Sequence, residues 1–83
     1  MACYNFKFVG KLYDIETIAR GKGVRVRKHL NHRYGRGRWR KLKGKALIEY
    51  NNGEVWVAEV HWFEANGIGQ RDHKSIKDIE RIT

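Results

Sequence analysis

The chain has 83 residues, 41% of them hydrophobic and 12% aromatic, and a formal net charge of +9 at pH 7. This composition excludes a disordered tail and predicts a single domain, residues 1–83, with a modest core. No apolar run approaches the roughly 20 residues that span a bilayer, and the start of the chain lacks the apolar core of a secretory signal. The lone Cys3 excludes an intrachain disulfide and a cysteine-based zinc cluster. We therefore expect a cytoplasmic protein with no membrane partner.

Positive charge is concentrated in one stretch of the sequence. From Thr17 to Ile48 there are 12 Lys or Arg residues and no Asp or Glu. A single surface lysine is usually just a solvated group. An acid-free run of this length inside a folded domain favours an anionic partner instead.

The first part of the chain predicts two strands. Tyr4, Phe6 and Phe8 alternate with polar residues in the segment 4–9, which is typical of a half-buried strand. The segment 12–19 also alternates, but it has helical spacing behind a possible N-cap, so both a strand and a helix are open there. Its Thr and Ile content, and the glycines that follow it, favour the strand.

The segment 24–34 is the best helix candidate. Val26 and Leu30 share one side with either Arg33 or Tyr34, and the next residue is a glycine placed to end the helix. The other sides carry cations, and no acid lies one turn away to balance them. A helix with one apolar stripe is predicted here.

A turn of sequence Asn51-Asn52-Gly53 lies between two runs rich in β-branched and aromatic residues. This pattern predicts a hairpin of residues 38–50 and 54–64. A three-residue loop with the glycine left-handed places Tyr50 opposite Glu54. A two-residue loop shifts the register by one residue and changes which side chains share a face.

The three-residue register is the one we predict. It places Lys45 opposite Glu59, an opposite-charge pair that favours this alignment. It also gathers the large apolar residues on one face and leaves lysines on the other. The predicted apolar face consists of Leu42, Ala46, Ile48, Tyr50, Trp56, Ala58, Val60 and Trp62.

The end of the chain is less regular. Residues 70–74 predict a further strand, and Ser75 to Asp78 resembles a capping box, so a short terminal helix or a last edge strand are both open. Together the elements predict an α+β fold: a small antiparallel sheet of four or five strands, centred on the hairpin, with one main helix packed on one face.

Three motifs are shared with a known group of proteins. They are the Trp-Arg-Lys basic run within Arg36–Gly44, the Ala-Glu-Val-His-Trp strand within Ala58–Ala65, and the loop Gly67-Ile68-Gly69. With these motifs, residues 21–77 resemble a family of small uncharacterised bacterial proteins. The resemblance implies a self-contained bacterial domain, and it gives no information about catalysis.

Nucleic acid is the partner that the charge pattern predicts. Cations contact phosphates and release counterions, and an exposed ring offers a stacking platform for an unpaired base. RNA or single strands are favoured because no groove-reading motif is present. The alternative for Trp39 and Phe63 is that they pack under the helix. The predicted nucleic-acid-binding residues are Arg25, Lys28, Arg33, Arg36, Arg38, Trp39, Lys41 and Lys43.

Two other functions remain open. A small basic ribonuclease of the toxin-like kind would use a histidine such as His61, beside Glu59, for acid–base chemistry. A protein-interaction module would bind an acidic partner protein. His29 and His32 have chelating spacing but lack further ligands, so no metal site, no cofactor and no catalytic residue is assigned.

Overall fold

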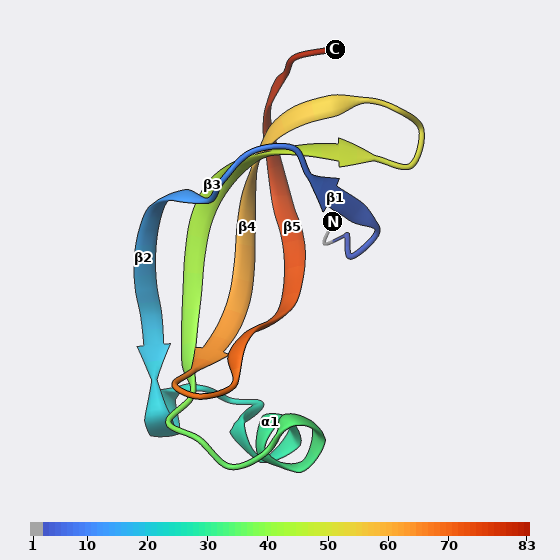
Figure 1. Ribbon diagram of the computed structural model, residues 1–83. Helices are drawn as coiled ribbons and strands as arrows, with labels where there is room; N and C mark the ends of the chain where they lie inside the picture. Colours follow the sequence, from blue (N-terminus) through green and yellow to red (C-terminus); the bar gives the residue numbers. More distant parts are fainter. Residues whose placement is uncertain (1–2) are drawn as a thin grey trace.

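The computed structural model describes residues 3–83 (Figure 1). All its strand pairs are antiparallel, in the order β1-β3-β4-β5, and β2 also pairs with β3. This arrangement of one helix with a curled sheet confirms the predicted α+β fold class. The elements are β1 (Phe6–Phe8), β2 (Tyr13–Arg20), a 3-10 turn (Gly21–Gly23), α1 (Arg27–Tyr34), β3 (Arg40–Tyr50), β4 (Val55–Ala65) and β5 (Gly69–Arg81).

The long strand β3 organises the sheet. It bends strongly, so that β2 pairs with its first half and β1 with its second half (Figure 1). Near the start of the described chain, Cys3 forms an isolated bridge with Ser75 of β5, and each residue donates its N–H to the other's carbonyl at 2.8 Å. The bridge joins the β1 side of the sheet to β5, so the curled sheet encloses a core.

The predicted hairpin register is confirmed. The Tyr50 N–H donates to the Glu54 carbonyl at 2.9 Å, and Gly53 has a φ of 86°, the left-handed conformation that the three-residue loop requires. Lys45 lies opposite Glu59 as expected. Its ion pair, however, forms with Asp14 of β2 at 3.5 Å, so the cross-strand charge pair that favoured the register is not the contact that the lysine makes.

The inside of the curl holds the main core. Trp62 is 1% exposed, whereas Trp56, predicted on the same apolar face, is only partly buried. Trp56 lies near the hairpin turn, where its Nε1–H donates to Glu54 Oε1 at 2.9 Å. The buried members of the core are Leu42, Ala46, Ile48, Ala58, Val60 and Trp62.

A second, smaller cluster lies where α1 meets one end of the sheet, so the helix is not packed on one face of the sheet as predicted (Figure 1). It contains Val24, Leu30 and Trp39 with Ala65, all nearly inaccessible to solvent. The predicted apolar stripe is therefore partly wrong, because Val26 is 42% exposed and Val24 takes the buried place. The helix begins later than predicted, at Arg27, so Val26 only precedes it.

The ends of the sheet also differ from expectation. β1 is shorter than predicted, and Tyr4 and Phe8 are 63% and 41% exposed, so this strand buries little. The segment 12–19 is the favoured strand, within β2. β5 continues through Ser75 and Asp78, which excludes the terminal helix and confirms the last edge strand. There the buried Ser75 forms an antiparallel bridge with Cys3, a backbone pairing that a residue in a helix could not make.

Candidate nucleic-acid interface

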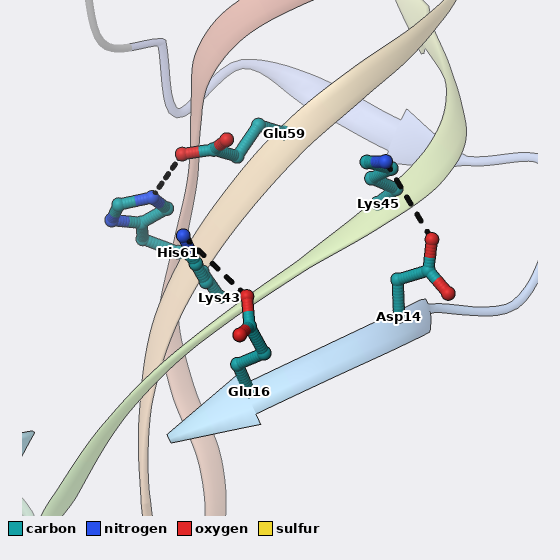
Figure 2. Close-up of polar contacts among 6 residues, drawn as sticks. All are labelled: Asp14, Glu16, Lys43, Lys45, Glu59 and His61. Carbon is teal, nitrogen blue, oxygen red and sulfur yellow. Dashed lines mark hydrogen bonds and ion pairs between the residues drawn. The ribbon is translucent and has the colours of Figure 1, made fainter. Parts of the chain in front are cut away.

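The lysines at the middle of the sheet are neutralised by carboxylates. Lys43 pairs with Glu16 and Lys45 with Asp14, each at 3.5 Å (Figure 2). The two acids precede the acid-free segment in sequence, but β2 lies antiparallel beside β3 and brings them across from the lysines. Lys43, a predicted binding residue, is therefore already engaged by a carboxylate.

An acid–base pair lies next to these ion pairs on β4. The His61 Nε2–H donates to Glu59 Oε2 at 2.7 Å (Figure 2). This hydrogen bond holds the pKa of Glu59 below its ordinary value, and burial partly opposes it. The pair can exchange a proton, and Lys77 and Lys74 of β5, which lie opposite Glu59 and His61, add positive charge beside it.

The helix end of the molecule has a different charge balance. Within residues 3–83, no Lys or Arg from Arg20 to Arg38 forms an ion pair with a carboxylate. Five exposed cations on this segment are among the predicted binding residues, and together we call them the basic end. The basic end consists of Arg25, Lys28, Arg33, Arg36 and Arg38.

A hollow of about 220 Å³ lies at the basic end, between Arg20, Arg38 and Arg40. Arg20 and Arg40 are directly opposite each other on β2 and β3, an arrangement that like charges disfavour. Glu64 neutralises Arg40 at 2.6 Å, and no carboxylate pairs with the other two guanidinium groups among the described residues. The hollow therefore suits an anion such as a phosphate group.

A second hollow, of about 370 Å³, lies beside Phe63. It brings together Arg25 and Lys41, which the sequence predicted, and Lys74 of β5, which it did not. Lys74 was missed because it is far along the chain and joins the site only through the pairing of β5 with β4. An isolated lysine in a charged strand offers no sequence pattern that would have identified it.

Trp39 corrects the prediction most directly. Its side chain is fully buried, and its Nε1–H donates to Asn31 Oδ1 at 3.0 Å, so its ring cannot stack on a base. Trp39 precedes β3 and packs beneath α1 with Leu30, which is the alternative that the sequence left open. At Gly37 the chain is so close to the sheet that an added Cβ would lie 2.9 Å from the Cβ of Ala65.

The C-terminal end of α1 is fixed to β5 through Tyr34. Its hydroxyl donates to Asp72, and this hydrogen bond, with burial and the charge of Asp72, raises the pKa of Tyr34. Arg33 and Arg71 each lie over the ring, with 5.4 Å between the guanidinium carbon and the ring centroid. These contacts hold Arg33 at the surface and place Arg71 of β5 beside the basic end.

Acidification should destabilise the protein through His73. Its ring stacks on Trp62 with centroids 5.7 Å apart, and burial lowers its pKa below 6.5, against the opposing charges of Asp72 and Glu64. The unfolded chain then binds the proton more readily, so stability is lost as pH falls below about 6.5 toward the folded-state pKa. We expect urea unfolding from about pH 7 to about pH 5 to show this slope, and His73→Gln to flatten it.

His32→Gln, on the exposed side of α1, is the matched control and should keep the wild-type slope. An unchanged slope in His73→Gln would assign the pH dependence to another group. Below about pH 4.5, Glu59 adds a separate loss, because a carboxyl with a lowered pKa stabilises the fold only while ionised.

Comparisons with protein-family models, with curated proteins and with solved structures found no match for this chain. The resemblance to the small bacterial family therefore stays a prediction. Among residues 3–83, no helix has the length and apolar character needed to cross a membrane. The same residues contain no group of three or more His, Cys, Asp or Glu side chains placed to hold a metal ion.

Proposed function

We propose that this protein binds nucleic acid through the basic end, with RNA or single strands favoured over duplex DNA. The observation that carries the proposal is the contrast in charge balance along one acid-free sequence. The mid-sheet cations Lys43 and Lys45 have carboxylate partners, whereas those from Arg20 to Arg38 have none among the described residues. Uncompensated cations gathered on one end of a fold raise the local concentration of a polyanion.

The preference for unpaired strands follows from shape. α1 has only 8 residues and is held against the sheet by Leu30, so it does not project as a recognition helix does. The hollows beside it are small recesses rather than a long groove. Recesses lined by cations suit bases and phosphates that are free to turn outward, as in single strands and RNA loops.

The test is a binding titration of the purified protein with single- and double-stranded RNA and DNA. We expect saturable binding that weakens as salt increases, with single strands and RNA bound more tightly than duplex DNA. No saturable binding to any of the four would overturn the proposal and favour an acidic protein partner. Loss of RNA without added metal would favour the ribonuclease alternative, and Glu59→Gln should then abolish the cleavage.

A further inference from the structure

The hollow beside Phe63 joins a partly exposed aromatic ring to three cations. Its apolar wall is formed by Ile18 of β2, Val26 ahead of α1 and Phe63 of β4. Ile18 and Val26 are each 42% exposed, so apolar surface is left open at the centre of a strongly basic region. Arg25, Lys41 and Lys74 complete the lining.

We infer that this hollow is a subsite for one unpaired base of a single-stranded nucleic acid, with the ring of Phe63 as its stacking platform. The inference rests on the proposed function and deepens it. A volume of about 370 Å³ falls within the about 300–1,000 Å³ range of small-molecule sites. A base seated there would cover the exposed Ile18 and Val26 side chains.

The cations around the hollow are positioned for the phosphates on either side of that base. Arg25 precedes α1 and Lys74 belongs to β5, and neither forms an ion pair within residues 3–83. Lys41 Nζ lies 6.0 Å from the Phe63 centroid, at the outer limit of a cation–π contact. Lys41 is therefore free to move to a phosphate and leave the ring to the base.

Two other hollows lack one part of this combination. The hollow of about 480 Å³ at the middle of the sheet has no aromatic ring in its lining, and its two lysines are paired with Asp14 and Glu16. The hollow around Arg38 has cations, but the aromatic residue in its lining is Trp39, whose ring is buried. Phe63 is only partly buried, so part of its ring remains accessible.

The inference is tested with an oligouridylate of about ten nucleotides, a length typical of single-strand sites. Phe63→Leu keeps an apolar side chain against the helix cluster but removes the aromatic face. We expect it to weaken oligouridylate binding by on the order of tenfold or more, with little change in affinity for heparin, a polyanion without bases. Phe63→Tyr should restore the affinity.

Phe8→Leu is the matched control, because it makes the same change at a partly exposed phenylalanine on β1. It should leave oligouridylate binding unchanged. If wild type binds the oligonucleotide and Phe63→Leu binds it equally well, the base subsite is wrong while the proposed function stands. If wild type binds no nucleic acid, the proposed function itself fails.

A second measurement covers the case in which Phe63→Leu does not fold. Ultraviolet crosslinking of wild-type protein to oligouridylate, followed by peptide mapping, should join uridine to Phe63 or to a neighbour lining the hollow. Crosslinks confined to other parts of the chain would overturn the inference without any variant. Thermal unfolding of Phe63→Leu decides which of the two experiments is used.

Discussion

Replacing Trp62 with alanine is expected to lower the free energy of unfolding by about 3–5 kcal/mol. Trp62 is 1% exposed in the main core and stacks on His73, and its Nε1–H donates to Glu64 Oε1 at 3.3 Å. Alanine would leave a cavity inside a curled sheet that β3, β4 and β5 hold in place, so collapse around it is restricted. Domains have total stabilities of about 5–15 kcal/mol, so this loss is a large fraction.

Urea unfolding of Trp62→Ala and Trp56→Ala checks the expectation. Trp56 is chemically matched but only partly buried near the hairpin turn, and its replacement should cost less, about 1–2 kcal/mol. Equal losses for the two variants would contradict the assignment of Trp62 to the centre of the core. A near-native unfolding curve for Trp62→Ala would contradict it more strongly.

The hairpin was predictable because its determinants are local. The turn 51–53 and the alternation on either side specify the register within about ten residues, and the observed pairing of Ile48 with Trp56 follows from them. Local patterns also identified the end of α1, where the N–H of Gly35 donates to the Asn31 carbonyl at 3.0 Å. Such contacts require only near neighbours in the sequence.

The packing of Trp39 depended on distant parts of the chain. A tryptophan one residue before a basic strand, with lysines at alternate positions, fits an open face equally well. Its burial requires α1 to fold back against the end of the sheet and Asn31 to present an acceptor to the indole. The burial of Val24 in place of Val26 was also not predictable. The 3-10 turn and the later start of the helix change which of the two valines faces the cluster.

The sequence also predicted only part of the charge distribution. The absence of acids from 17–48 says nothing about acids that other strands bring alongside. The antiparallel pairing of β2 with β3 places Asp14 and Glu16 next to Lys45 and Lys43. The cations without a carboxylate partner are therefore found mainly at the basic end and not along the whole segment 17–48. Lys41 and Lys74 add to them at the hollow beside Phe63.

Arg36→Ala combined with Arg38→Ala is expected to weaken single-strand binding by about tenfold or more at low salt, and to reduce the salt dependence. Both side chains are exposed at the basic end and neither forms an ion pair among the described residues. Each phosphate contact contributes about 0.7 to the slope of log affinity against log salt for single strands. The double variant should therefore lose about 1.4 from that slope if both contacts are direct.

Lys43→Ala combined with Lys45→Ala is the matched control, because it removes the same formal charge from the same acid-free segment. The carboxylates of Glu16 and Asp14 lie beside these two lysines and offset their charge locally, so their contribution to phosphate binding should be small and the slope nearly unchanged. Titrations of both double variants at several salt concentrations make the comparison. A localised site at the basic end requires the two loop arginines to contribute more to affinity than the two strand lysines. Equal losses of affinity and of slope in the two double variants would therefore mean that net charge alone governs binding.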